Sequence, residues 1–228
     1  MILVLNLKMN LSKDNIIDYE KIIHDKDVIV LPQFPYMIFF SRGKYKLGSQ
    51  DVSKFSKGSY TGEVCAKGLK KLGATYSLVG HSERKEHFNE TLSDSKMKIK
   101  NLNDNDMIPI FCVNQTEEEY NNDKEYKGIE EQLEAIPEYT KYIVVAYEPI
   151  WMIGNESATL DIDHIENVLI KIKSYLMERN INHSIIYGGG ISENNIAQLK
   201  NLKCNDGFII STSALDKERL EYIYKETR

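Results

Sequence analysis

The chain has 228 residues, of which 42% are hydrophobic, and its formal net charge is −5. That length allows one domain or two, and the apolar content is enough for one sizeable core. A net negative charge gives no basic field, so nucleic acid and anionic membrane are poor candidates as partners.

The chain start and the cysteines both point to the cytoplasm. Met1–Leu7 is apolar, but Lys8 interrupts it too early for a signal peptide or a spanning helix. The three cysteines, Cys65, Cys112 and Cys204, lack metal-ligand spacing and form an odd number. We therefore predict reduced thiols in the cytoplasm, with no disulfide and no metal site.

Short apolar runs alternate with helical patterns along the whole chain. Eight runs have the length and composition of strands: Ile2–Leu7, Asp27–Leu31, Tyr45–Gln50, Tyr76–Val79, Ile108–Val113, Tyr142–Tyr147, Ser184–Tyr187 and Gly207–Ile210. Most are continuously apolar, as in parallel strands that are buried on both faces. Among the intervening segments, Leu160–Arg179 has apolar residues at helical spacing, and a last helix is expected from near Leu215.

This alternation predicts an α/β fold, a (β/α)8 barrel of eight parallel strands ringed by helices. Eight repeats leave about 28 residues for each unit, which is lean for such a barrel but within its range. No linker divides the chain, so we expect one domain over residues 1–228. An open doubly wound sheet has the same periodicity, but as a nucleotide binder it would carry a glycine-rich turn after its first strand. The turn here, Lys8-Met9-Asn10-Leu11, has no glycine.

Four polar side chains follow or end predicted strands and offer groups for proton transfer. Because strand ends converge on one face of a closed barrel, Asn6, Lys8, His81 and Glu148 are expected to meet there. A cation, an imidazole and a carboxylate at one site are the groups that acid–base catalysis uses. Each residue taken alone is more often structural, so the assignment depends on the set.

The histidines differ in their predicted surroundings. His81 alone follows a strand in a loop, and Ser82-Glu83 could open a short helix there. The other four are expected on the surface: His24, His87, His164 and His183.

Two loops are candidates for binding an anion through backbone N–H groups. Barrel enzymes often hold phosphate after strands seven and eight, where this chain has Gly188-Gly189-Gly190 and Ser211-Thr212-Ser213. Three glycines allow a backbone to approach an anion closely. A plain tight turn explains them equally well.

Four stretches resemble motifs of the triosephosphate isomerase family in their residues and in their order along the chain. The resemblance runs from Asn6 to Leu215. They are Asn6-Leu7-Lys8, Val79–Arg84, Ala146–Trp151 and Tyr187-Gly188-Gly189. The resemblance implies a TIM barrel and a reaction without cofactor or metal, in which dihydroxyacetone phosphate and D-glyceraldehyde 3-phosphate interconvert through an enediolate. The segment Ile150–Gly154 resembles the family's mobile lid.

The resemblance also implies a role for each site residue. Glu148 would be the general base, and His81 would polarise the carbonyl and move protons between the substrate oxygens. Lys8 would face the substrate oxygen, where Glu83 could pair with it in the empty enzyme. The implied substrate-binding residues are Asn6, Lys8, Gly154, Gly190, Ser211 and Thr212.

The chain departs from the family at four places, all near the phosphate or the lid. The family usually has serine at Gly190, two glycines at Ser211-Thr212, Gly-Thr-Gly-Lys at Gly154-Asn155-Glu156-Ser157, and Gly-Glu at Asn114-Gln115. A glycine-only backbone at Ser211-Thr212 would be costly, and the Glu156 carboxylate would weaken phosphate binding. Two alternatives stay open: an isomerase of a related ketose phosphate, such as a four-carbon one, and a sugar-phosphate-binding barrel without catalysis.

The stretch Gly58–Glu63 resembles the family's long third loop, which inserts into a neighbouring subunit. The resemblance implies a homodimer in which Thr61 approaches Asn6 and Lys8 of the partner. The Ser, Lys and Gly content of this stretch also suits a floppy loop.

Overall fold

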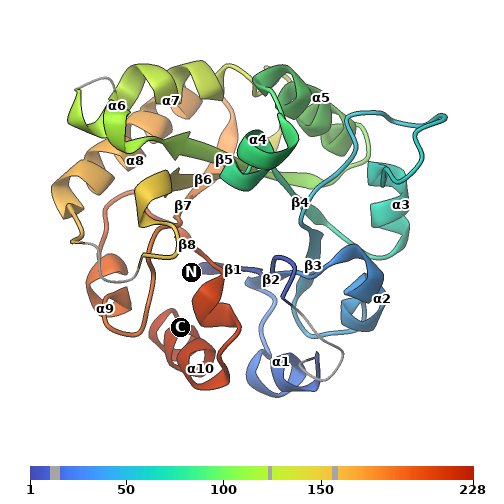
Figure 1. The fold of residues 1–228 in the computed structure, drawn as a ribbon, viewed down its shortest axis with the longest axis horizontal. Coiled ribbons are helices and arrows are strands. Elements are labelled where there is room, and N and C mark those ends of the chain that lie inside the picture. The colour runs from blue at the N-terminus through green and yellow to red at the C-terminus, as the bar shows by residue number, and fades with distance from the viewer. Residues whose placement is uncertain (11–15, 123–124, 156–158) are drawn as a thin grey trace.

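A computed structural model describes residues 1–10, 16–122, 125–155 and 159–228. Its eight parallel strands close into a barrel in chain order, with helices outside (Figure 1). The strands are β1 (Ile2–Asn6), β2 (Val28–Leu31), β3 (Lys46–Ser49), β4 (Tyr76–Val79), β5 (Ile108–Gln115), β6 (Tyr142–Pro149), β7 (Asn182–Tyr187) and β8 (Gly207–Ile210). The predicted (β/α)8 barrel is confirmed, and the open sheet is excluded because β1 pairs with β8.

The helices follow the strands around the outside of the barrel. They are α1 (Ile16–Ile22), α2 (Met37–Phe40), α3 (Ala66–Lys71), α4 (Ser82–Phe88), α5 (Leu92–Asn103), α6 (Glu117–Asn121), α7 (Glu125–Leu133), α8 (Ile162–Glu178), α9 (Ile196–Leu199) and α10 (Lys217–Glu226). Short 3₁₀ turns, η2 (Phe34–Tyr36), η3 (Ile150–Met152) and η4 (Thr212–Ala214), lie in the loops after β2, β6 and β8. No helix in the described ranges is long and apolar enough to cross a membrane.

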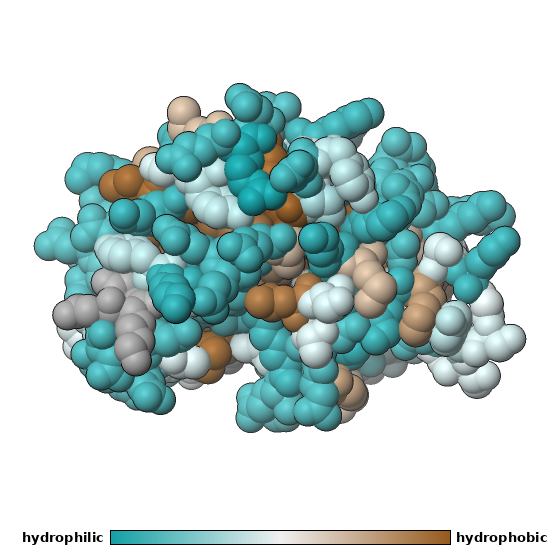
Figure 2. Space-filling model, turned by 90° about the horizontal axis from the view of Figure 1, so that it is seen from above, coloured by the Kyte–Doolittle hydropathy of each residue, from teal (hydrophilic) through white to brown (hydrophobic). Residues whose placement is uncertain are grey.

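Two apolar layers explain why the strands are apolar without alternation. One cluster fills the barrel interior and includes Val4, Leu78, Cys112 and Ile186. A second, larger cluster lies between strands and helices and includes Leu5 and other fully buried residues. Both faces of each strand are therefore buried, as the sequence pattern predicted. The outer face in Figure 2 is mostly hydrophilic, with smaller hydrophobic areas between the polar side chains.

Several predicted boundaries differ from the structure by one or two residues. Strands β5 and β6 each run two residues further, because Asn114 pairs with Glu148 and Gln115 with Pro149 in their shared ladder. Helix α10 begins at Lys217 instead of Leu215. The Asp216 carboxylate accepts hydrogen bonds from the N–H groups of the second and third helical residues at 3.0 Å, which sets the helix start.

Closure of the barrel depends on one glycine, Gly207, at the seam between β1 and β8. A Cβ atom added there would lie 1.9 Å from the carbonyl oxygen of Ile2. Backbone atoms at the seam cannot move without breaking the ladder that joins the two ends of the chain.

We expect Gly207→Ala to lower the free energy of unfolding by about 1–3 kcal/mol, because the added methyl overlaps backbone. Gly68→Ala in α3 is the control, since its Cβ would meet only Cys65 Sγ at 3.7 Å. That change should raise stability by up to about 1 kcal/mol. Urea denaturation measures both, and equal stabilities for the two variants would contradict the account of the seam.

Candidate active site

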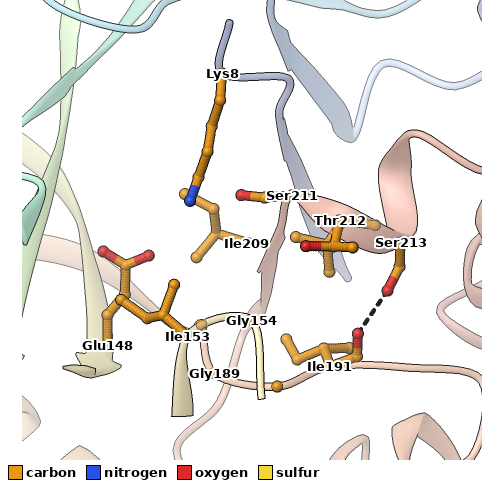
Figure 3. A pocket seen from close by; sticks show the side chains of 13 residues that line it. Lys8, Glu148, Ile153, Gly154, Gly189, Ile191, Ile209, Ser211, Thr212 and Ser213 are labelled. Carbon is orange, nitrogen blue, oxygen red and sulfur yellow. Dashed lines mark hydrogen bonds between the residues drawn. The ribbon is translucent and has the colours of Figure 1, made fainter. Parts of the chain in front are cut away.

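The carboxyl ends of the strands converge on a pocket at the barrel mouth. It is lined by Lys8 after β1, Glu148 in β6, the glycine turn after β7 and the loop after β8. Figure 3 shows Lys8 and Glu148 pointing into this pocket from different sides, with Ser211 and Thr212 along its edge. Of the predicted site residues, Lys8, Glu148, Gly154, Gly190, Ser211 and Thr212 share this pocket.

Asn6 and His81 line a neighbouring hollow, to which Lys8 also belongs. The two hollows are linked by the contact between His81 and Glu148, whose Nε2 and Oε1 atoms lie 3.7 Å apart. The structure thus brings the four predicted catalytic residues to one mouth, on either side of this contact.

Glu148 is a buried carboxylate with one oxygen that accepts no hydrogen bond. The residue is 5% exposed, and its Oε2 atom is buried without a partner among the described residues. Gly188 makes room for it, because a Cβ there would lie 3.0 Å from Glu148 Cγ. A buried carboxylate that lacks a full set of hydrogen bonds is costly for stability, and such groups are concentrated at functional sites.

His81 caps the N-terminus of α4 with its own ring. Its Nδ1 accepts a hydrogen bond from the Glu83 N–H at 3.3 Å, so the tautomer that this bond selects carries its proton on Nε2. Nε2 faces Glu148, and the residue is 4% exposed. The imidazole is therefore arranged to donate a hydrogen bond into the mouth.

Lys8 has a left-handed backbone, with a φ of 47°. That conformation costs a residue other than glycine about 1–2 kcal/mol. The surrounding polar groups hold it: Asn6 Oδ1 accepts from the Lys8 N–H at 3.3 Å, and Gln50 Nε2 donates to the Lys8 carbonyl at 2.8 Å. Gln50 also donates to the Leu31 carbonyl at 2.9 Å.

Gln50 is a positioning residue that the sequence did not single out. Its only signal was its place at the end of the third apolar run, which gave no hint of the backbone that it binds. The contact is with Lys8, 42 residues away in the chain.

The Lys8 ammonium lies on the Glu83 carboxylate, with a distance of 2.5 Å between Nζ and Oε1. Burial acts to raise the pKa of Glu83, but the hydrogen bond from Lys8 and the positive charge of Lys8 lower it below its usual value. The pair predicted for the ligand-free site is present.

Gly190 packs directly against residues 150–155, which are the described part of the lid. Its φ is +55°, and a Cβ there would lie 2.7 Å from the Asn155 carbonyl oxygen and 3.2 Å from that of Met152. The serine that the family usually has could not fit without moving lid backbone. Glu156, whose charge we expected near the phosphate, lies outside the described residues together with Ser157.

The loop after β8 does not adopt a glycine-only backbone. Ser211 has a φ of −127°, and η4 follows it directly. The strain expected from Ser211-Thr212 in place of two glycines is therefore absent. The Ser213 hydroxyl donates to the Ile191 carbonyl at 2.7 Å, which ties this loop to the one after the glycine turn (Figure 3).

The surface prediction for His164 is wrong. Its Nε2 lies 2.9 Å from Gln115 Oε1 and 3.3 Å from the Tyr147 hydroxyl, and the residue is half-buried. His183, at the start of β7, is also half-buried, whereas His24 and His87 are exposed as predicted. Periodicity missed His164 because its partners come from two distant strands, β5 and β6.

Comparison with known proteins gives one family. The sequence matches the family model described as Triosephosphate isomerase over residues 1–227. It is 35% identical over 204 residues to the triosephosphate isomerase of Mesomycoplasma hyopneumoniae strain 232, covering 87% of this chain and 82% of that protein. It is 33% identical over 228 residues to that of Ureaplasma parvum serovar 3, covering 94% of each.

We expect Gly190→Ser to loosen the lid, because the new side chain overlaps the Asn155 carbonyl. Hydrogen exchange at the Ile153 amide, which donates to the Ile150 carbonyl at 3.2 Å, should accelerate about tenfold or more, equivalent to about 1.4 kcal/mol.

Gly154→Ser is the matched control. Gly154 also has a positive φ, of +72°, but no described atom lies within 4 Å of its ideal Cβ. It should show the left-handed backbone cost without the overlap. If the Ile153 amide exchanged at the same rate in both variants, overlap between residue 190 and the lid would not be what loosens the lid.

Proposed function

The chain belongs to the triosephosphate isomerase family, and we propose that it performs the reaction of that name with the residues at the barrel mouth. It is therefore an intramolecular aldose–ketose isomerase, which interconverts dihydroxyacetone phosphate and D-glyceraldehyde 3-phosphate. The observation that carries the assignment of residues is the 3.7 Å contact between His81 and buried Glu148, with Lys8 in the adjoining wall.

Glu148 is the base in this proposal, and its burial supports the role. The carboxylate takes a proton from the carbon beside the carbonyl and returns it to the neighbouring carbon. Its Oε2 accepts no hydrogen bond from the described residues, which leaves that atom available for the proton.

His81 and Lys8 stabilise the negative charge that develops on the substrate oxygens. The Nε2–H of His81 donates to the carbonyl oxygen and moves protons between the two oxygens of the enediolate. The Lys8 ammonium supplies a positive charge in the same mouth. Its 2.5 Å contact with Glu83 keeps this cation at the site before substrate arrives.

The substrate phosphate binds between the glycine turn and the loop after β8 in this proposal. Gly190, Ser211 and Thr212 line that end of the pocket together with Gly154 of the lid. The backbone N–H groups at the start of η4 favour the binding of an anion, because a helical first turn leaves them without intrahelical partners. The lid closes over the enediolate and excludes water.

Glu148→Asp tests the base. Shortening the side chain withdraws the carboxylate by about one methylene, and we expect kcat to fall at least a hundredfold while the fold persists. Glu117→Asp in exposed α6 is the control and should keep normal turnover. A coupled assay with triose phosphates and with four-carbon ketose phosphates measures both variants. Near wild-type turnover by Glu148→Asp would remove Glu148 from this role, and a preference for the four-carbon substrate would overturn the assigned substrate.

We also propose that the enzyme is a homodimer in which the Thr61 loop, residues 50–65, reaches the partner. This loop projects from between β3 and α3 (Figure 1). Its base is closed by a hydrogen bond from the Ser53 N–H to the Val64 carbonyl at 2.9 Å. Phe55 and Tyr60 stack with ring centroids 3.7 Å apart, so the loop holds its own shape.

A receiving surface lies beside the catalytic lysine. A hollow of about 500 Å³ is lined by Asn6 and Lys8 and by the apolar Met9, Phe34 and Phe88. Met9 is 86% exposed and Phe88 64% exposed. Apolar side chains that are exposed beside a polar site favour a protein partner, and a two-fold axis would let each copy fill the hollow of the other.

Thr61→Arg tests the dimer by placing a second cation near the partner's Lys8. We expect light scattering to show loss of mass and the assay to show a parallel loss of activity. Thr75→Arg is the control, because Thr75 is exposed just before β4, at the end of the barrel away from the mouth. A wild-type protein that is fully active as a monomer would contradict the proposal.

Two further proposals concern the chain as a whole. We propose one domain over residues 1–228, supported by the pairing of β1 with β8 from the two ends of the chain. We propose a cytoplasmic location, supported by the unpaired state of Cys65, Cys112 and Cys204.

A further inference from the structure

Lys85 lies on α4, one turn after His81, and its ammonium has only neutral partners. It donates to Asn114 Oδ1 and to Gln132 Oε1, both at 2.8 Å. No carboxylate in the described part of the chain forms an ion pair with it. Burial lowers the pKa of Lys85, whereas nearby Cys112 and Glu148 act to raise it.

Asn114 connects this cation to the proposed base. In the β5–β6 ladder Asn114 is paired directly with Glu148. Paired residues of parallel strands have Cα atoms about 4.8 Å apart, with side chains on the same face. The Lys85 ammonium is thus bound to the side chain of the residue that pairs with Glu148 across the two strands.

The other charges near Lys85 and Glu148 already have partners. Glu90 pairs with Lys98 at 2.5 Å and with Arg84 at 3.1 Å. Glu119 accepts from the Thr116 N–H at 2.7 Å. Glu83 holds Lys8, and His81 is neutral in the tautomer that its hydrogen bond selects.

Gln115, the residue after Asn114, adds no negative charge near Lys85. The family usually has glutamate where this chain has Gln115, and Gln115 accepts from Tyr147 and His164 instead. Among these charged groups of the described chain, Lys85 is the one without an ion-pair partner.

We propose that Lys85 is a positioning residue for the reaction: its ammonium, which Asn114 holds beside Glu148, keeps that carboxylate in its charged form. The inference depends on the proposed role of Glu148 as base. A carboxylate buried in the barrel mouth would otherwise shift toward its neutral, inactive form, and a nearby positive charge opposes that shift.

Lys85→Met tests the charge through the pH dependence of kcat/KM. Removing the cation disfavours the charged carboxylate, so the acidic limb of the profile should move up by about one pH unit. Lys85→Arg keeps the charge and should keep the limb near its wild-type position. Lys70→Met, at an exposed pair with Asp106, is the control for losing a lysine. Titration of the substrate phosphate is common to all variants and cancels in the comparison.

Asn114→Asp separates the effect of the Lys85 charge on the reaction from the effect of Lys85 on stability. Aspartate retains the oxygen that accepts from Lys85, and the Asn114 Nδ2 has no partner to lose. The new carboxylate neutralises Lys85, so the acidic limb should again move up, while the urea midpoint should not fall. Lys85→Met should lower that midpoint, because it removes two hydrogen bonds.

The inference is overturned if Lys85→Met lowers kcat/KM equally at every pH, or if Asn114→Asp leaves the limb in place. Either result makes Lys85 purely structural while Glu148 stays essential. Failure of the proposed function is distinguishable, because Glu148→Asp would then keep full turnover whatever Lys85 variants do.

Discussion

The burial of a single carboxylate is the constraint on which the barrel mouth depends. Glu148 is removed from water, and one of its oxygens accepts no hydrogen bond among the described residues. An isolated charge in such a place would cost several kcal/mol or would become neutral. Gly188 leaves space for the side chain, the imidazole of His81 contacts it, and the Lys8 ammonium lies in the same mouth. In a site of low dielectric each of these interactions is stronger than it would be in water.

A second constraint is the backbone that presents the cation. Lys8 has a left-handed backbone directly after β1, and Asn6 and Gln50 hold it with hydrogen bonds to its N–H and carbonyl. The site thus includes two residues, Asn6 and Gln50, that act on backbone, and strain is confined to the residue that needs it.

The sequence predicted the fold almost completely, because eight apolar runs separated by helical patterns have few other solutions. All eight runs are strands in the structure. Boundaries were less certain where polar residues continue a ladder, as Asn114 and Gln115 do in β5. Apolarity marks buried positions, and these two residues are buried but polar.

The sequence pointed to individual residues of the site but not to the hydrogen bonds between them. Motif wording pointed to Asn6, Lys8, His81 and Glu148, and the structure brings them together. The bonds from Gln50 to Lys8 and from Lys85 to Asn114 join positions 42 and 29 residues apart. No periodicity reports such pairs, because they depend on which strands become neighbours and on the directions of single side chains. The same holds for His164, which was expected in solvent.

The contact between Gly190 and the lid has a consequence for how this sequence could have diverged. A serine at 190 and a lid carbonyl at its present place exclude each other, so the two features are epistatic. A lineage that began with serine would have had to lose that side chain before, or together with, the move of the lid backbone. Afterwards reversion at 190 alone is disfavoured, because the serine would overlap the Asn155 carbonyl of the lid. Gly190 therefore makes the change in the lid hard to reverse during evolution.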